Sequence, residues 1–153
     1  MLVFVVADGA GGRSGGARAA DLVAARVVTE VAANPGTPPD WVPLLRRIDE
    51  EVLADEVAGE STAVIGAVVG DQVTGASVGD SEAWLIGGSS FTVLTATQDR
   101  LRLGTGCAAP TEFAASLGSA LLLAASDGLF NPASAESICA TARANESAEA
   151  FVD

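Results

Sequence analysis

The chain has 153 residues, a length typical of one ordinary domain, and 49% of them are hydrophobic, which excludes an intrinsically disordered protein. Its 20 acidic residues against 8 arginines give a formal net charge of -12, which argues against a nucleic-acid partner. Such a charge favours metal cations or basic protein segments as partners; the alternative is that it only keeps the protein soluble. Without histidine, mechanisms that need an imidazole base are excluded, leaving carboxylates, hydroxyls, arginines and backbone groups.

Neither the apolar runs nor the cysteines indicate a membrane or secreted protein. The longest apolar runs, residues 2–7 and 120–125, are far shorter than the roughly 20 residues of a membrane-spanning helix. The first residues have no basic stretch before the apolar run, which argues against a signal peptide. Cys107 and Cys139 are too few and too far apart for a disulfide framework or a zinc cluster. We therefore expect a cytoplasmic protein with no membrane partner.

The first third of the chain predicts a strand followed by two helices. Residues 2–7 are apolar and rich in β-branched side chains up to the turn DGAGG, the pattern of a strand buried on both faces. Apolar residues then recur at helical spacing over 17–33, until Asn34-Pro35-Gly36 interrupts the pattern. Asp40 is a good N-cap for a second amphipathic helix that runs to about residue 57. Trp41 in this helix, like Trp84 later, is expected to pack in the core.

The rest of the chain predicts hairpins and then helices. Glycine-containing turns separate two pairs of β-type runs, which we expect to form one antiparallel meander: 62–69 with 72–78, and 82–86 with 91–95. Residues 96–117 are expected to be irregular, 120–125 to form a strand, and Asn131-Pro132 to begin a helix to about residue 144, with a further helix from 147 onward. Hairpins and paired helices favour a single α+β layered domain over 1–153 rather than a doubly wound parallel sheet.

Three aspartates share one local design, in which an apolar strand ends in a glycine-containing turn. They are Asp8 in VVADGAGG, Asp80 in ASVGDSEAWLI and Asp127 in LLLAASDGLF. A strand end holds the carboxylate rigidly while backbone carbonyls approach the same point, and hard cations such as Mg²⁺ bind carboxylates, carbonyls and water. The alternative is that each Asp-Gly pair marks only a turn. Taken together, Asp8 and Asp127 predict the centre of a divalent-metal site that performs hydrolysis.

The order of these motifs resembles the metal-dependent serine/threonine protein phosphatases, also called the PPM or type 2C family. The segments DGAGG, ESTAVIGAVV, VGDSEAWLI and LLLAASDGLF follow in the family's order between Val5 and Phe130 and match its DGxGG, GST, GDSRA and SDGL signatures with modest departures. The resemblance implies a four-layer α-β-β-α sandwich, in which two antiparallel sheets are flanked by helices. Ser61-Thr62 would begin a strand beside the site, where its hydroxyls could hydrogen-bond to the backbone.

The resemblance also implies roles for individual residues. Asp8 matches the aspartate that bridges two Mn²⁺ or Mg²⁺ ions, the Gly9 carbonyl a further ligand, Asp127 the second metal-binding aspartate, and Asp80 an aspartate associated with a weaker third metal. The implied reaction is hydrolysis of phosphoserine or phosphothreonine in a phosphorylated protein by a metal-activated water, with no catalytic side-chain nucleophile. Arg13, just after DGAGG, could reach a phosphate oxygen, or could be a solvated loop arginine.

Departures from the family pattern leave alternatives open. The family's strands before DGxGG, and its closing strand with a further acidic ligand, have no match, and Asp153 is only a weakly placed candidate for that ligand. Ala10 replaces a histidine common in eukaryotic members, and Glu82 replaces the arginine of GDSRA. We therefore expect a phosphatase, with two alternatives: a catalytically impaired pseudophosphatase or interaction domain of the same fold, or a piece of a longer active enzyme.

Overall fold

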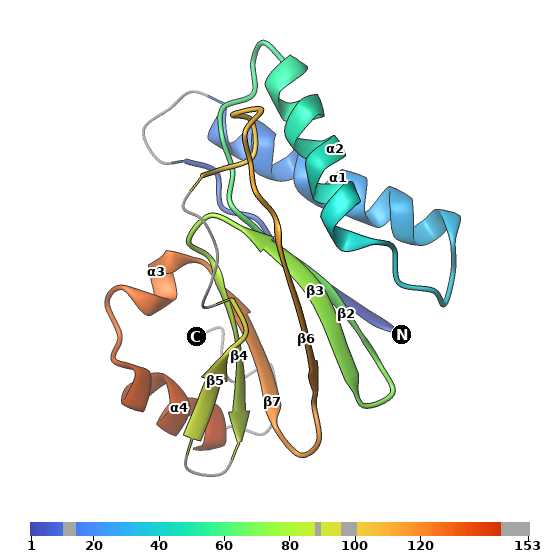
Figure 1. Ribbon diagram of the computed structural model, residues 1–153. Coiled ribbons are helices and arrows are strands. Elements are labelled where there is room, and N and C mark those ends of the chain that lie inside the picture. Colours follow the sequence, from blue (N-terminus) through green and yellow to red (C-terminus); the bar gives the residue numbers. More distant parts are fainter. Residues whose placement is uncertain (11–14, 88–89, 96–100, 145–153) are drawn as a thin grey trace.

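The computed structural model describes residues 1–10, 15–87, 90–95 and 101–144 (Figure 1). Its elements, in chain order, are β1 (Leu2–Val6), α1 (Gly16–Ala33), α2 (Trp41–Ala54), β2 (Ala63–Val69), β3 (Gln72–Val78), β4 (Glu82–Gly87), β5 (Ser90–Val93), β6 (Thr111–Ser116), β7 (Leu121–Ala125), α3 (Asp127–Phe130) and α4 (Ala135–Ala144). None of the helices in these ranges combines the length and hydropathy that a membrane crossing requires.

The strands form two antiparallel sheets. The first has the order β1-β2-β3-β6 and the second the order β5-β4-β7. Figure 1 shows α1 and α2 together outside the first sheet, and α3 and α4 together beside the second. The layers therefore run helix, sheet, sheet, helix. This confirms the predicted α+β class and the four-layer sandwich.

A separate hydrophobic core lies at each boundary between layers. Trp41 packs between the first helix pair and the first sheet with Leu45 and Ile65, and its indole N–H donates to Thr74 Oγ1 at 3.3 Å. Val64, Val73, Ala83 and Phe113 form the buried centre of the core between the sheets. Trp84 packs between the second sheet and α4, where its ring stacks on Phe91 and Phe130 at 4.4 and 4.7 Å. Both tryptophans are core residues, as predicted.

The two long helices pack through stripes with helical spacing. Ala19, Val23 and Val27 of α1 are fully buried, as is Leu45 of α2. Asp40 occupies the N-cap position, where its backbone carbonyl accepts the Leu44 N–H at 3.2 Å, but its side chain makes no capping hydrogen bond. The helix ends at Ala54 rather than near residue 57, because the following residue turns the chain.

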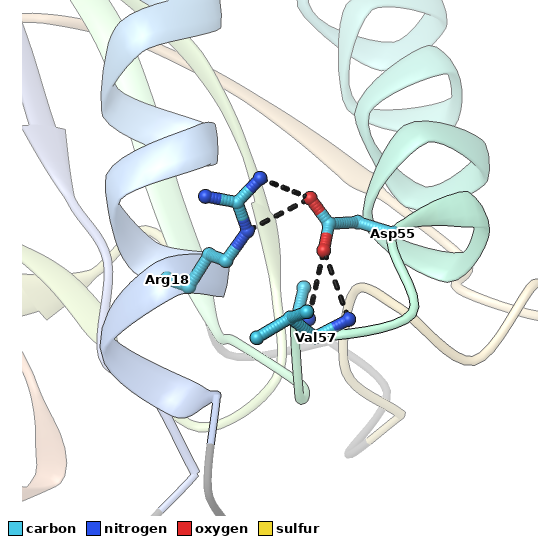
Figure 2. Close-up of polar contacts among 4 residues, drawn as sticks. Arg18, Asp55 and Val57 are labelled. Atoms are coloured by element: carbon cyan, nitrogen blue, oxygen red, sulfur yellow. Dashed lines mark hydrogen bonds and ion pairs between the residues drawn. The ribbon is translucent and has the colours of Figure 1, made fainter.

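Asp55 forms that turn and is held by Arg18 from α1 (Figure 2). Its Oδ2 accepts hydrogen bonds from Arg18 Nε and Nη2 at 2.8 and 2.6 Å, and its Oδ1 accepts those of the Val57 and Ala58 backbone N–H groups, both at 3.0 Å. The Arg18 hydrogen bond is the main reason that the pKa of Asp55 falls to about 2. The pair thus ties the end of α2 to the start of α1.

Replacing Arg18 by glutamine should raise the pKa of Asp55 from about 2 toward its usual value of about 3.9. A carboxylate with a lowered pKa stabilises the folded state above the unfolded pKa, and that contribution is lost as the pH falls from about 4 toward about 2. The substitution should therefore reduce the loss of folding free energy as the pH falls from about 4 to about 2. NMR titration of the Asp55 carboxyl carbon measures the shift. Arg26→Gln, which breaks only the Arg26–Glu51 pair, is the control; an unchanged Asp55 titration in Arg18→Gln would contradict the assignment.

One predicted irregular segment contains a strand. Within residues 96–117, β6 pairs with β3 from Gln72 opposite Ser116 to Ser77 opposite Thr111. Its sequence, TEFAAS, carries a single large apolar side chain, that of Phe113, so its two-residue alternation is weak. Phe113 lies opposite Gly75, where a Cβ atom would come within 2.3 Å of the ring. The ring therefore covers the glycine, a pairing that strand patterning does not reveal.

The predicted single meander is wrong, because its two hairpins lie in different sheets. The hairpin β2–β3 belongs to the first sheet and β4–β5 to the second. The chain crosses from one sheet to the other over residues 79–81. Gly79 has a positive φ of 91°, which permits this sharp change of direction.

The strands β1 and β7 are not buried on both faces as predicted for β1. Each is an edge strand of its sheet within the described residues, and Leu2 is 65% exposed. An apolar groove of about 400 Å³ separates the two edges and is lined by Leu2, Phe4, Val6, Val68, Leu117, Leu122 and Ala124. A uniformly apolar run predicts a strand, but it does not show whether both faces of that strand are covered, and β1 is at most partly buried along its length.

The helix predicted to begin at Asn131-Pro132 begins later, at Ala135, and ends at Ala144 as predicted, while the short α3 before it was not predicted. Asn131 ends the short α3, since its backbone N–H donates to the Asp127 carbonyl at 2.8 Å. The helix α4 instead begins after Ser134, whose Oγ accepts the Ser137 N–H at 3.2 Å in the manner of an N-cap. Cys139 of α4 is buried and Cys107 is exposed, and both are free. The further helix expected from residue 147 onward lies outside the described residues.

Candidate metal centre

The three predicted aspartates lie at the same end of the sandwich. Each follows the last residue of a strand by two positions: Val6 of β1, Val78 of β3 and Ala125 of β7. Val6 is opposite Val64, Val78 is opposite Ala63, and Ala125 is opposite Glu82, the residue that begins β4 just after the crossing. The ends of these strands therefore meet where the chain passes between the sheets. Asp8, Asp80 and Asp127 are all partly buried there.

Asp8 and Gly9 continue the pairing of β1 with β2 beyond the regular strands. The Asp8 carbonyl accepts the Thr62 N–H at 2.9 Å, and Gly9 lies opposite Ser61 at the next position. In an antiparallel ladder such alternate positions turn their backbone groups away from the partner, so the Gly9 carbonyl faces the outer side of β1. Gly9 must also be a glycine, because a Cβ atom would lie 2.2 Å from the carbonyl carbon of Gly16.

The hydroxyl groups of Ser61 and Thr62 reach the Asp8 backbone, as the sequence predicts. Ser61 Oγ lies within hydrogen-bond distance of two carbonyl oxygens, those of Asp8 at 3.2 Å and Thr62 at 2.8 Å, and Thr62 Oγ1 accepts the Asp8 N–H at 3.3 Å. Both residues are buried. The strand end that carries Asp8 is thus fixed by side chains as well as by the ladder.

Asp80 faces an arginine that the sequence did not single out. Arg102 Nη2 lies 3.5 Å from Asp80 Oδ2, with the two side chains 37% and 43% exposed. Arg102 is held near the site because Leu103 pairs with Ser61 through two backbone hydrogen bonds of 2.9 and 3.1 Å. Arg102 is 22 positions from Asp80 in the sequence, and no local sequence pattern predicts their contact. Arg13, the predicted phosphate ligand, lies outside the described residues, as does Asp153.

Asp127 is the first residue of α3. Its Oδ2 accepts a hydrogen bond from Asn131 Nδ2 at 3.0 Å, one turn further on. Glu82, the residue in place of the family's arginine, also has a partner, since its Oε2 accepts the Trp84 indole N–H at 2.5 Å. This contact gives the Glu82 carboxylate a partner on its own strand, and Glu82 adds a further carboxylate to this end of the sandwich.

A buried carboxylate from α2 organises the segment that carries Arg102. Asp49 is only 4% exposed. Its Oδ1 accepts the backbone N–H groups of Gly104, Thr105 and Gly106 at 2.7, 3.1 and 3.1 Å, and its Oδ2 accepts that of Ala108 at 3.1 Å. The one available signal in the sequence was an acidic residue beside the apolar face of α2, four positions after Leu45.

The donor atoms at this end of the sandwich suit a hard divalent cation. Carboxylate and carbonyl oxygens are the ligands of Mg²⁺ and Mn²⁺, and such ions are often held by one or two carboxylates together with water. In the parts of the chain that the structure describes, no three acidic or cysteine side chains form a group that could hold an ion. The donor atoms are therefore of the kind that binds such an ion, and the described residues supply only part of a set of ligands for it.

Solved structures of bacterial serine/threonine phosphatases share this fold. A bacterial serine phosphatase superposes with a TM-score of 0.77 over 91% of this chain and 72% of its own, at 19% identity. Stp1 from Staphylococcus aureus superposes with a TM-score of 0.75 over 89% of this chain and 68% of its own, at 19% identity. PstP from Mycobacterium tuberculosis superposes with a TM-score of 0.77 over 97% of this chain and 77% of its own, at 23% identity. A structure of the PstP catalytic domain contains two manganese ions. No family model and no curated protein sequence matches the chain. The chain thus has the fold of the metal-dependent serine/threonine phosphatases, as the motifs predicted.

Proposed function

We propose that this protein is a metal-dependent phosphoprotein phosphatase that hydrolyses phosphoserine or phosphothreonine. One observation supports the proposal: on a fold shared with bacterial serine/threonine phosphatases, three aspartates follow three strands by the same two positions, and these strand ends lie at one end of the sandwich. We likewise propose a phosphorylated protein rather than a nucleic acid as the substrate, because a net charge of -12 repels phosphate backbones.

The proposed roles follow from the position of each residue. Asp8, the Gly9 carbonyl and Asp127 would hold two Mn²⁺ or Mg²⁺ ions, with Asp80 as a further ligand. Bound ions of this kind supply an activated water and neutralise phosphoryl oxygens. Asp8 is kept in place by Ser61 and Thr62, and Arg13 is the proposed phosphate-binding residue. No side chain needs to act as a nucleophile, which suits a chain without histidine.

Release of phosphate from a phosphothreonine peptide tests the proposal directly. With the peptide flanked by basic residues, turnover should require Mn²⁺ or Mg²⁺ and should stop when the metal is removed with EDTA. A matched non-phosphorylated peptide and a phosphate ester of a nucleotide serve as controls. Absence of any metal-dependent turnover would contradict an enzymatic role for this chain.

A catalytically impaired pseudophosphatase is the second candidate, and two observations favour it. The described residues contain no group of three metal-binding side chains, and Asp80 and Asp127 are engaged by Arg102 and Asn131. Calorimetric titration with Mn²⁺ separates the candidates. Tight binding of two ions would exclude the pseudophosphatase, and no binding at millimolar Mn²⁺ would exclude the enzyme.

A further inference from the structure

The backbone pairing of β1 with β2 is altered at Asp8. In a regular hydrogen-bonded pair, each residue would accept the N–H of the other through its carbonyl. The Thr62 N–H does donate to the Asp8 carbonyl, at 2.9 Å, but the Asp8 N–H donates to the Thr62 hydroxyl, at 3.3 Å. The Thr62 carbonyl accepts the Ser61 hydroxyl instead, at 2.8 Å. A side chain therefore replaces a backbone group at the position of the candidate metal ligand.

The same Thr62 side chain contacts both neighbours of Asp80. Its Oγ1 forms a hydrogen bond of 2.6 Å with Ser81 Oγ, and both hydroxyls are buried. Its methyl group packs against the turn at Gly79, where a Cβ atom would come within 2.8 Å of Thr62 Cγ2. One side chain of β2 thus touches the backbone of Asp8 on one strand and the turn that presents Asp80 on another.

We propose that Thr62 and Ser81 are positioning residues, whose paired hydroxyls set the Asp8 carboxylate and couple it to Asp80 for divalent-metal binding. The inference rests on the proposed metal centre. Groups that orient the ligands of a metal typically change its affinity by about 10- to 100-fold when removed. Thr62 and Ser81 do not themselves bind the ion, so their loss should weaken binding while leaving the ligands in the chain.

Calorimetric titration with Mn²⁺ tests the pair in the full chain. Thr62→Val keeps the shape of the side chain and removes its hydroxyl, and we expect the dissociation constant to rise at least about tenfold. Ser81→Ala should give a smaller rise. The double variant should bind about as weakly as Thr62→Val alone, because the two changes remove one shared interaction. Thr62→Ser, which restores the hydroxyl, should bind as the wild type does.

Ser77→Ala is the matched control. Ser77 on β3 is also fully buried, and its hydroxyl has no hydrogen-bond partner in the part of the chain that the structure describes. Its removal should leave the Mn²⁺ affinity unchanged, and thermal unfolding of every variant without metal separates loss of affinity from loss of folding. If Thr62→Val does not fold, Ser81→Ala decides the question. Wild-type affinity in both would overturn the inference while the metal centre stands, whereas a wild-type chain that binds no Mn²⁺ would overturn both.

Discussion

Replacing Asp8 by asparagine should lower metal-dependent hydrolysis of a phosphothreonine peptide by roughly a thousandfold. A metal ion contributes several kcal/mol of transition-state charge stabilisation, and a loss of about 4 kcal/mol corresponds to about three powers of ten in rate. Asparagine has nearly the same shape as aspartate and keeps the backbone hydrogen bonds to Thr62, so the fold should persist. Phosphate release at saturating Mn²⁺ is the measurement, accompanied by calorimetry for Mn²⁺.

Asp127→Asn should have a similar effect, because the two carboxylates are proposed to serve one centre. Asp21→Asn changes the charge by the same amount on the exposed surface of α1 and should retain wild-type turnover. This control separates the loss of a ligand from the loss of one negative charge. Turnover in Asp8→Asn equal to that of Asp21→Asn would remove Asp8 from the centre.

Replacing Asp49 by alanine should destabilise the fold by about 4 kcal/mol, because four backbone N–H groups lose a charged acceptor in a buried place. For a chain of this length, that loss corresponds to a fall in the melting temperature of about 10 °C. Urea unfolding followed by circular dichroism measures the change. We also expect the Mn²⁺-dependent activity to fall, since the anchored segment carries Arg102 beside Asp80.

Two companion variants sharpen this prediction. Glu50→Ala alters the next residue of α2, which is exposed, and should change the free energy of unfolding by no more than about 0.5 kcal/mol. Asp49→Asn retains one acceptor oxygen but places an amide donor against a backbone N–H group. Its loss of folding free energy should therefore lie between those of Glu50→Ala and Asp49→Ala. If Asp49→Ala and Glu50→Ala were equally stable, the carboxylate would have no role in fixing the segment.

The predicted strand ends were correct because their signals are local. Asp8, Asp80 and Asp127 each follow an apolar run that a glycine turn interrupts, and both properties belong to a few consecutive residues. The strand β6 was missed because TEFAAS has only one large apolar side chain and depends on Gly75 of β3 for its packing. Local patterning cannot reveal a strand whose stability comes from its partner.

The surroundings of the aspartates could not be predicted, because they join distant parts of the chain. Arg102 reaches Asp80 across 22 positions, and Asp49 reaches the segment after Leu103 across 55 to 59 positions. The division of the two hairpins between two sheets has the same origin. Each hairpin is local, but the sheet to which it belongs is completed by strands from elsewhere in the sequence, β1 and β6 for the first hairpin and β7 for the second. The resemblance to a known family implied the two-sheet sandwich, which the residue pattern alone did not, but it implied none of these contacts.

The placement of the two tryptophans makes the layers of this protein separately visible in solution. Trp41 lies in the core of the first sheet and its helices, and Trp84 lies in the core of the second sheet with α4. The chain has no tyrosine, so these two indoles account for nearly all its ultraviolet fluorescence. A variant that keeps only one of them reports on one half alone. Comparing the two emission transitions would tell whether the halves melt as one cooperative unit or in succession.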